Sequence, residues 1–393
     1  MNATRFGVTH SDHKRMAMWY HGTLLGSTRL LLMVAVTFMF QTPSAYSVTV
    51  TTINGPGGSS TEPVAINNAG QVVGNYYDGS TTRGFLFDKG TLTTLDFLGA
   101  AYTNAVATGR AGQVVGHYWD PALEQVRGFL FEEGRYTSLG FPGAVVTIPV
   151  AVNAVGQVVG YYELADHVLH AFLYHQGTFL TIDPPGSEWA FPSAINNTGL
   201  VIGSYSVAGG IGHGFLYDGT AFIVFDPPGS TDTVPIALNE AGQVVGLYNA
   251  PGELGGAFLY EKGVVSIIHV PGSLLTQAFG INEEGQIIGA YADADDIYQG
   301  FTFQAGTFTT ISVPGATGTT AVAINSAGRI AGYYFDAAFR SHCYIFERGA
   351  ITIVDGPGAL ETSIPWFGSL NARGEFTGFY VTPDNVHHGF VAR

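Results

Sequence analysis

One short segment recurs along most of the chain and constrains the fold more than any other feature. AINNAGQVVGNYY at 65–77 is echoed by AVNAVGQVVGYY at 151–162, AINNTGLVIGSY at 194–205, ALNEAGQVVGLY at 237–248, GINEEGQIIGAY at 280–291 and AINSAGRIAGYY at 323–334, with weaker copies near 107 and 369. The turn glycines of these eight copies lie 42 to 46 residues apart: Gly70, Gly112, Gly156, Gly199, Gly242, Gly285, Gly328 and Gly374. A period near 43 residues is typical of the blades of a β-propeller.

Each copy predicts four short strands. The VAIN segment is the first, and an N-x-x-G turn leads into the second, QVVGNYY. The third is GFLF or HAFLY, and after a DKG or EKG turn the fourth reads TLTTLDF or TFTTISV and ends at a Pro-Gly turn. Asn at the first and Gly at the last position of such a turn suit a type I turn.

The two ends of the repeated region complement each other. Residues 388–393, HGFVAR, form a third strand that no fourth strand follows, whereas VTVTTINGPG at 48–57 is a fourth strand that no unit precedes. Pairing these two segments leaves no free sheet edge, whereas a solenoid needs capping repeats. The sequence therefore predicts an all-β chain with one domain at 48–393: an eight-bladed β-propeller of four-stranded antiparallel blades, closed by the N-terminal strand, which completes the last blade.

The first 47 residues differ from the repeats. Arg5, Lys14, Arg15 and Arg29 precede an apolar run at 30–40, LLLMVAVTFMF, and small residues follow at Ala45 and Ser47. This order is typical of a signal peptide, cut after Ser47 or after Ala45. The run is shorter than the roughly 20 residues of a membrane anchor. We therefore expect a secreted or periplasmic protein, with no membrane insertion once residues 1–47 are removed.

The charge of the repeated region restricts its partners. Residues 1–47 contain four bases and one acid, which leaves residues 48–393 with a net charge of −18, against −15 for the whole chain. Such an acidic protein is a poor candidate for binding nucleic acid or an anionic membrane surface. The single cysteine, Cys343, allows no internal disulfide and lies in the strand-like HCYIF, where we expect it to be buried.

The motifs also carry a resemblance to a known family. HAFLY at 170–174, HGFLY at 213–217 and the recurring AIN..GQVVG resemble the bacterial extracellular repeat family named after its His-Ala-Phe motif, over residues 48–393. The resemblance implies export from a bacterium and a repeat-built β fold, and it implies no established activity. Four copies depart from the motif histidine, with Arg83, Arg127, Gly256 and Gln299, and Gly109 replaces one turn asparagine.

Two repeated side chains invite a functional and a structural interpretation. Eight tyrosines stand two residues after the glycine of the second strand: Tyr76, Tyr118, Tyr162, Tyr205, Tyr248, Tyr291, Tyr334 and Tyr380. Such a ring can stack sugars, but eight equivalent copies favour packing between blades with each hydroxyl on a loop carbonyl. The motif histidines are His170, His213, His342 and His388, and a structural hydrogen bond is favoured over metal binding because equivalent positions do not converge.

The variable loops are the stronger candidates for function. The loops that follow the second and fourth strands share one face, and they carry many acidic residues and one base, Arg340. Aromatic side chains beside carboxylates are typical of carbohydrate or cation recognition. The candidate ligand-binding residues are Tyr102, Trp119, Asp120, Glu188, Trp189, Asp232, Asp336 and Trp366. Asp293, Asp295 and Asp296 are candidate calcium ligands, although their loop lacks the glycine and distal glutamate of an EF-hand.

The sequence thus predicts a binding or interaction module for an extracellular carbohydrate or protein. H-E-x-x-H, G-x-S-x-G and P-loop motifs are missing from the sequence, so no catalytic residue is assigned and a non-enzymatic role is favoured. One alternative is a polysaccharide hydrolase or lyase that uses loop carboxylates, since such acid pairs are defined by separation in space. The other is a structural surface protein. Calcium is the one cofactor that the sequence suggests.

Overall fold

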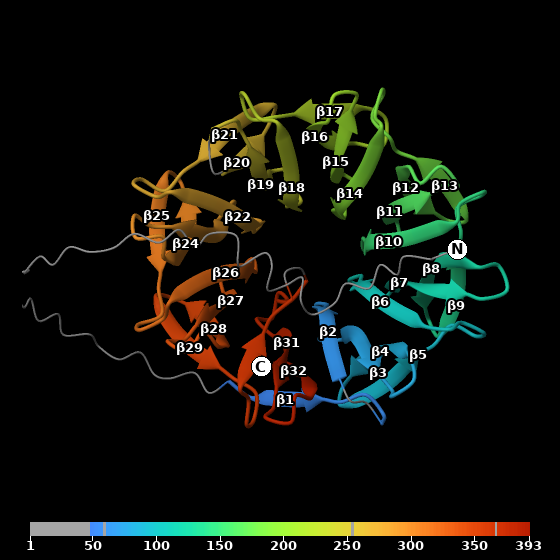
Figure 1. The fold of residues 1–393 in the computed structure, drawn as a ribbon, viewed down its shortest axis with the longest axis horizontal. Helices are drawn as coiled ribbons and strands as arrows, with labels where there is room; N and C mark the ends of the chain where they lie inside the picture. Colours follow the sequence, from blue (N-terminus) through green and yellow to red (C-terminus); the bar gives the residue numbers. More distant parts are fainter. Residues whose placement is uncertain (1–47, 58–59, 253–254, 366–367) are drawn as a thin grey trace, which may run out of the picture. The chain divides into compact units, whose positions relative to one another are not determined.

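The computed structural model describes residues 48–57, 60–252, 255–365 and 368–393, all within one structural unit, Ala45–Arg393. The predicted signal peptide at 1–47 and the candidate Trp366 lie outside the described residues. The described part of the chain forms β-strands joined by turns and short loops (Figure 1).

The strands form four-stranded antiparallel groups, as each repeat predicts. The first strands are β2 (Ser60–Ile66), β6 (Thr103–Thr108), β10 (Val146–Val152), β14 (Trp189–Ile195), β18 (Asp232–Leu238), β22 (Leu275–Ile281), β26 (Gly318–Ile324) and β30 (Glu361–Ser363). The second strands are β3 (Val72–Tyr77), β7 (Val114–Asp120), β11 (Val158–Glu163), β15 (Val201–Val207), β19 (Val244–Asn249), β23 (Ile287–Ala292), β27 (Ile330–Phe335) and β31 (Phe376–Val381).

The outer two strands of each group follow the same order. The third strands are β4 (Thr82–Asp88), β8 (Gln125–Glu132), β12 (Leu169–His175), β16 (Ile211–Tyr217), β20 (Gly256–Glu261), β24 (Tyr298–Gln304), β28 (Ser341–Glu347) and β32 (His387–Ala392). The fourth strands are β5 (Thr91–Leu95), β9 (Arg135–Leu139), β13 (Thr178–Thr181), β17 (Phe222–Phe225), β21 (Val264–Ile268), β25 (Thr307–Ile311), β29 (Ala350–Val354) and, from the other end of the chain, β1 (Val50–Ile53).

Most groups are separate sheets, and two pairs of groups are joined. Four sheets have four strands, and two have eight. Each eight-stranded sheet is held together by a single parallel bridge, Ser60 to His387 in one and Val146 to Val126 in the other. A single bridge is the smallest possible pairing of two strands. Each eight-stranded sheet therefore consists of two four-stranded groups that touch at one residue pair.

The first strand lies at the edge of its four-stranded group, and in seven of the eight groups it carries a bulge; the short strand β30 shows none. The register shifts between Pro63 and Ala65 in β2, and again between Pro149 and Ala151 in β10. Proline cannot donate to a ladder and is therefore found on edge strands or at bulges. The recurring proline of this segment is explained by that position.

The N-terminal strand pairs with the last strand of the chain, as the sequence predicts. β1 runs antiparallel to β32 with Val50 opposite Ala392 and Ile53 opposite Gly389, and Figure 1 shows the two side by side. The Thr49 and Arg393 backbones exchange two further hydrogen bonds, of 2.8 and 3.0 Å. Tyr380 in β31 also shares a hydrogen bond of 3.0 Å with Thr52, the same contact that Tyr76 makes with Thr94 inside the first repeat.

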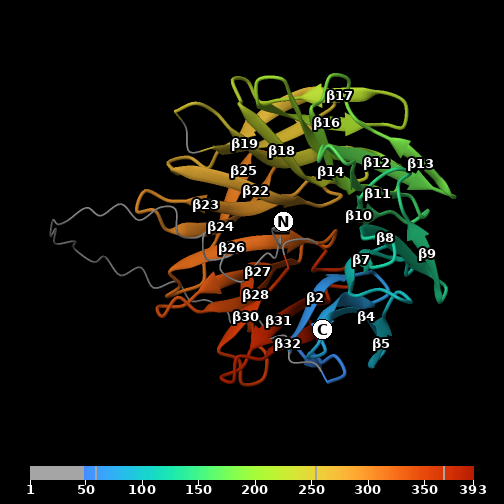
Figure 2. The ribbon, with the colours of Figure 1, turned by 45° about the vertical axis from the view of Figure 1, so that its right-hand side comes forward.

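The hydrophobic core lies between successive groups. One buried cluster joins Ala65 and Val73 of the first repeat to Ala105, Val114 and Phe129 of the second. The first strands β14, β18, β22 and β26 also contact one another in chain order, as Figures 1 and 2 both show. Each group therefore buries its sheet face against its neighbour, which is why a single repeat cannot form a core alone.

The second residue of the His-Ala-Phe motif is small because the next group approaches it closely. A Cβ on Gly128 would lie 2.8 Å from Cδ of Pro149, and one on Gly389 would lie 2.9 Å from Cδ of Pro63. Cys343 occupies the same position and is fully buried, as predicted. Burial raises the pKa of its thiol well above the usual value, which makes it a packing residue.

A ladder of buried asparagines links the turns of neighbouring groups. In each turn the asparagine Oδ1 accepts backbone N–H groups, as in Asn67 with Ala69 and Gln71. Its Nδ2 then donates to the carbonyl of the turn asparagine in the next group: Asn153 to Asn196, Asn196 to Asn239, Asn239 to Asn282, Asn282 to Asn325, Asn325 to Asn371 and Asn371 to Asn67, at 3.0 to 3.2 Å. Asn67 donates to Gly109, which has no side chain and interrupts the ladder.

Candidate functional site

Four of the repeated tyrosines have a clear structural role. Tyr76, Tyr118, Tyr162 and Tyr380 are each 3 to 5% exposed. Their hydroxyls bond to threonine or serine side chains of the fourth strand at 2.8 to 3.0 Å. The predicted packing of these four tyrosines is confirmed. The predicted partner of their hydroxyls, a loop carbonyl, is wrong, because a threonine or serine hydroxyl of the fourth strand lies within hydrogen-bond distance of each tyrosine hydroxyl.

The motif histidines also make structural hydrogen bonds. Nδ1 of His170 lies 2.6 Å from Oδ2 of Asp183, and the His213 ring lies 2.7 Å from Asp226. His342 pairs with Asp355 in the same way, at 3.0 Å. The predicted structural role is confirmed. The sequence signal for the partner is the aspartate that follows the fourth strand, thirteen residues after each of these histidines.

The loop face contains one hollow that brings together two predicted site residues. Glu188 and Trp189 line it with His167, Val168, Leu169 and Phe191, around a volume of about 470 Å³. Trp189 and Phe191 stand two residues apart on β14, so both side chains leave the same face of the strand, while Ala190 between them is fully buried. The Trp189 hollow, as we call it, therefore has an aromatic wall with a carboxylate at its edge.

The supporting residues were not predicted from the sequence. The Tyr161 ring lies 5.0 Å from that of Phe191 and links the aromatic wall to the neighbouring group. Burial raises the pKa of Tyr161, and the nearby Glu163 carboxylate acts in the same direction. The alternation in the segment W-A-F at 189–191 is the signal that would have identified Phe191.

The opposite wall is a tight turn held by its own polar groups. His167 adopts a left-handed conformation, with φ of 63°. Its backbone N–H donates to Leu164 O at 3.1 Å, and its ring Nδ1 pairs with the Glu163 carboxylate. Asp166 Oδ1 accepts the N–H of Val168 at 3.1 Å. These bonds position an imidazole and the two aliphatic side chains of Val168 and Leu169 across from Trp189.

The other predicted ligand residues lie elsewhere. Tyr102, Trp119 and Asp120 cluster around β7, where the Trp119 backbone bonds to Ala101 and Tyr102. Asp120 uses Oδ1 to accept the N–H of Ala122 at 3.0 Å. The structure thus places these residues in a separate local group.

Two predicted aspartates are engaged within their own surroundings. Oδ1 of Asp336 accepts the N–H groups of Ala338 and Arg340 at 2.8 and 2.9 Å, and these bonds lower its pKa. Asp232 begins β18 and lies 3.5 Å from the Asn249 amide. Neither residue lines the Trp189 hollow.

The predicted calcium loop is organised by its own backbone. Oδ1 of Asp293 accepts the N–H groups of Asp295 and Ile297, both at 3.0 Å. Within the described ranges, no group of three histidine, cysteine, aspartate or glutamate side chains converges in a metal-binding arrangement. Calcium binding by Asp293, Asp295 and Asp296 stays a prediction.

His117, beside Tyr102, has an unusual environment. No hydrogen-bond partner reaches its enclosed Nδ1 in the part of the chain that the structure describes, and Nε2 lies 3.2 Å from the Asn104 amide. The Tyr102 ring approaches it edge-on, with centroids 6.1 Å apart. Burial lowers the pKa of His117 to about 4.

This shift predicts a loss of stability in acid. Between about pH 6.5 and pH 4 the unfolded chain binds a proton at His117 and the folded chain does not. Protonation of His117 therefore favours the unfolded state. As the pH is lowered through this range, His117 alone should reduce the free energy of unfolding by up to about 3 kcal/mol. Replacing it by leucine, which repeat five has at Leu247, removes that contribution. Denaturant unfolding at several pH values should therefore show a shallower decline for His117→Leu than for the parent, and parallel profiles would contradict the assignment.

Comparisons with known proteins give the fold and no family. No protein-family model and no curated protein matches the chain. Among solved structures, a prolyl endopeptidase matches with 10% identity and a TM-score of 0.55, covering 86% of this chain and 55% of that one. A puromycin-hydrolysing peptidase of Mycobacterium tuberculosis matches with 11% identity and a TM-score of 0.50, covering 82% and 58%.

A third structure is the β-propeller domain of a trilobed protease from Pyrococcus furiosus, with 9% identity, a TM-score of 0.49 and coverage of 75% and 94%. The chain spans little more than half the length of the two peptidases. In the described residues, no helix is long and apolar enough to cross a membrane. At these identities the likeness concerns the fold alone: the chain is an all-β protein built from repeated propeller-type blades of four antiparallel strands.

Proposed function

We propose that the eight four-stranded groups form a closed eight-bladed propeller. The β1–β32 pairing supports this, because it supplies the fourth strand that the last repeat lacks. Three contacts between the last and first repeats add further support: Asn371 donates to Asn67 O at 3.0 Å, the His387 ring lies 2.7 Å from the Glu62 carboxylate, and Ile66 N–H donates to Gly368 O at 2.8 Å.

We further propose that this propeller is an exported binding module that holds carbohydrate in the Trp189 hollow. The observation that carries the proposal is a 37% exposed tryptophan beside the Glu188 carboxylate, in a hollow that Phe191 also lines. A flat aromatic face stacks on a sugar ring, and carboxylates accept hydrogen bonds from its hydroxyls. The supporting turn at 164–168 and the rings of Tyr161 and Phe191 hold this wall in place before a ligand arrives.

Export and family membership belong to the same proposal. The basic and apolar order of residues 1–40 supports a signal peptide, and the HAFLY and HGFLY segments support membership of the extracellular His-Ala-Phe repeat family. An extracellular polysaccharide fits an acidic surface better than nucleic acid does, because it brings no phosphate charge to repel.

Affinity gel electrophoresis against plant and microbial polysaccharides, with calcium and with chelator, tests the binding site. We expect at least one polysaccharide to retard the protein, and Trp189→Ala to weaken that binding about tenfold or more, since interface tryptophans contribute disproportionately. Tyr77→Ala is the matched control, because Tyr77 is 42% exposed and lies outside the hollow.

Each other outcome has a defined meaning. Retardation that is unchanged in Trp189→Ala, or lost equally in Tyr77→Ala, would refute the site. Shortening of the polysaccharide would favour the alternative of a hydrolase or lyase. Loss of binding in chelator would support the calcium prediction for Asp293. Absence of binding to the whole panel would favour a protein partner or a structural role.

A further inference from the structure

The part of the chain that forms the Trp189 hollow carries negative charge with no lysine or arginine to balance it. Residues 136–261 contain ten aspartates and glutamates and neither of these bases, and every residue that lines the hollow falls within this range. A cleft surrounded by charge of one sign concentrates ions of the opposite sign near its walls. The surroundings of the hollow therefore favour a positively charged ligand over a neutral or anionic one.

Glu188 is an exposed carboxylate that is free to receive such a ligand. Its backbone N–H donates to Ser206 O at 2.7 Å, which fixes the start of the side chain. In the described ranges its carboxylate makes no hydrogen bond or ion pair, whereas the Glu163 carboxylate is held by His167. The charge of Glu188 is therefore not compensated within the protein.

The acid at this position is a property of one repeat only. Glu188 stands two residues after the glycine of the turn that ends the fourth strand. The same position in the other copies holds Ser59, Ala101, Val145, Thr231, Leu274, Thr317 and Leu360. Equivalent positions share one place in the fold, so the architecture does not require a carboxylate there.

Trp189 adds an aromatic face beside this carboxylate. It is 37% exposed, and its backbone is paired with Ser206 in β15. Phe191 lines the hollow beside it, with the Tyr161 ring 5.0 Å from that of Phe191. The face of a tryptophan attracts a cation placed within about 6 Å of its ring centroid. A cation in the hollow therefore has two favourable partners on one wall.

The opposite wall does not repel a cation. His167 is the one base that lines the hollow, and its ring Nδ1 pairs with the Glu163 carboxylate, which balances the charge of a protonated imidazole. Asp166 on the same turn adds another carboxylate, whose Oδ1 accepts the N–H of Val168 at 3.1 Å. The turn therefore contributes net negative charge.

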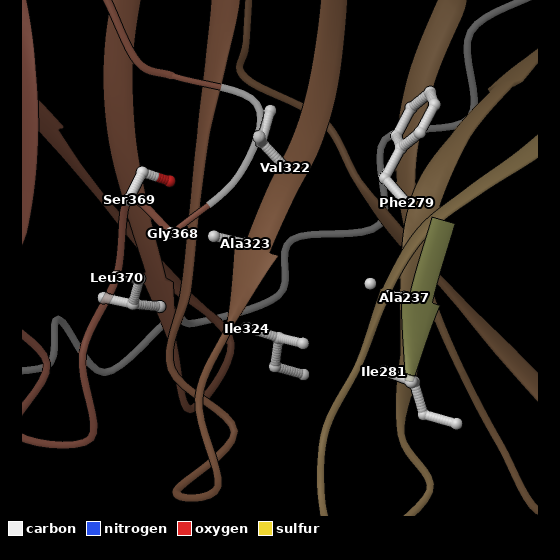
Figure 3. Close-up of a pocket in the computed structure, with 10 residues that line it drawn as sticks. Ala237, Phe279, Ile281, Val322, Ala323, Ile324, Gly368, Ser369 and Leu370 are labelled. Carbon is white, nitrogen blue, oxygen red and sulfur yellow. The ribbon is translucent and has the colours of Figure 1, made fainter. Parts of the chain in front are cut away.

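The hollow shown in Figure 3 has a different chemistry. It lies where β22 and β26 meet residues 368–370 and has a volume of about 170 Å³. Phe279, Ile281 and Val322 are among its lining residues, none of which is charged. A cation there would lose its water without a counter-charge, which is strongly unfavourable. The argument for a cation therefore applies to the Trp189 hollow and not to this one.

We propose that the Trp189 hollow binds an amino sugar with a free, protonated amine, such as the glucosamine units of a deacetylated polysaccharide. The sugar ring stacks on Trp189, and its ammonium group pairs with the Glu188 carboxylate. Acetylation of the amine removes the positive charge and leaves the ring, so the hollow distinguishes the two forms. This inference rests on the carbohydrate site proposed above and names the class of sugar that the site takes.

Calorimetric titration with two sugars tests the inference: a tetramer of glucosamine, and the same tetramer with every amine acetylated. At about pH 6 most of the amines carry a proton and glutamate is ionised. We expect the free-amine tetramer to bind at least about fivefold more tightly, the strength of an exposed ion pair. Raising the salt concentration should weaken its binding and leave that of the acetylated tetramer nearly unchanged.

Glu188→Gln isolates the carboxylate, because it removes the charge and keeps the shape of the side chain. It should weaken the free-amine tetramer about fivefold and the acetylated tetramer less than about twofold. Glu361→Gln is the matched control, since Glu361 is exposed, lies outside the hollow and changes the net charge of the protein by the same amount. Trp189→Ala should weaken both tetramers, and thermal melting shows whether each variant is folded.

Three results would overturn the inference. One is equal affinity of the folded parent protein for the two tetramers. Another is a loss of free-amine binding in Glu188→Gln that is no larger than in Glu361→Gln. The third is absence of binding by the free-amine tetramer. If the acetylated tetramer still binds and Trp189→Ala weakens it, the carbohydrate site stands without the preference for an amine, so the two failures are distinguishable.

Discussion

A chain that lacks Val48–Gly57 should lose several kcal/mol of its free energy of unfolding relative to a chain that begins at Val48. The deletion removes β1, exposes the edge of β32 and takes away Ile53, which is 1% exposed. Burial of one isoleucine alone typically stabilises by about 2–5 kcal/mol relative to alanine. Thermal and urea unfolding of the two chains measure the difference.

Two additional samples keep this prediction testable if the deletion variant does not fold. Ile53→Ala in the otherwise intact chain should lower stability by about 2–4 kcal/mol. A synthetic peptide of residues 48–57, added to the shortened chain, should restore its melting temperature in a concentration-dependent way, as strand addition to an open edge requires. A shortened chain as stable as its parent would contradict the closed propeller.

Replacement of a ladder asparagine should have the largest effect of any single polar substitution. Asn239 is 2% exposed, donates to Gln243 Oε1 at 2.6 Å and to Asn282 O at 3.0 Å, and accepts the Gln243 N–H at 3.0 Å. Asn239→Ala leaves these groups buried without that partner, which should lower the free energy of unfolding by about 3 kcal/mol. Urea unfolding measures the loss. Asn197→Ala is the comparison: this exposed asparagine also joins neighbouring turns, through Ala154 N–H and the Glu240 carboxylate, but its groups are solvated after the substitution, so the loss should be only about 1 kcal/mol.

The converse substitution, Gly109→Asn, should complete the ladder. A Cβ at Gly109 would lie 2.6 Å from Oε1 of Gln113, a flexible side chain whose oxygen has no partner among the described residues, and 3.4 Å from Asn153 O. Once the Gln113 side chain moves aside, an asparagine amide at position 109 can donate to both Gln113 Oε1 and Asn153 O. We therefore expect the free energy of unfolding to rise by about 1 kcal/mol. If Asn239→Ala costs no more than Asn197→Ala, the ladder contributes nothing to stability.

The alternative functions make different demands on the same surface. A hydrolase or lyase needs two carboxylates facing one substrate, and the Trp189 hollow is lined by one, Glu188, with Glu163 held against His167 in the adjacent turn. The aligned part of this chain covers 55 and 58% of the two peptidases that share the fold, and their activities say nothing about it at 10 to 11% identity. The described lining of this hollow therefore supplies one of the two carboxylates that such an enzyme needs.

The sequence by itself determined the repeat, the four strands of each copy and the pairing of β1 with β32. These follow from local patterns, because alternation of side chains and turn residues is readable within ten residues and the period counts the copies. It also assigned structural roles correctly to Cys343 and to His170. The partner of His170, Asp183, was within reach as well, since both residues belong to one repeat.

Only the tertiary structure decided which side chains meet across repeats. Asn67 has a complete local role in its own turn, so nothing in its segment indicates the bond to Gly109, 42 residues away. Trp189 and Glu188 share their hollow with His167 because a turn of one group faces the first strand of the next, whereas Trp119 and Asp336, chosen by the same composition, lie elsewhere. The composition of a loop can be read from the sequence, but it does not show which side chains converge. A site depends on the directions of side chains from neighbouring sheets, and the packing of whole sheets fixes those directions.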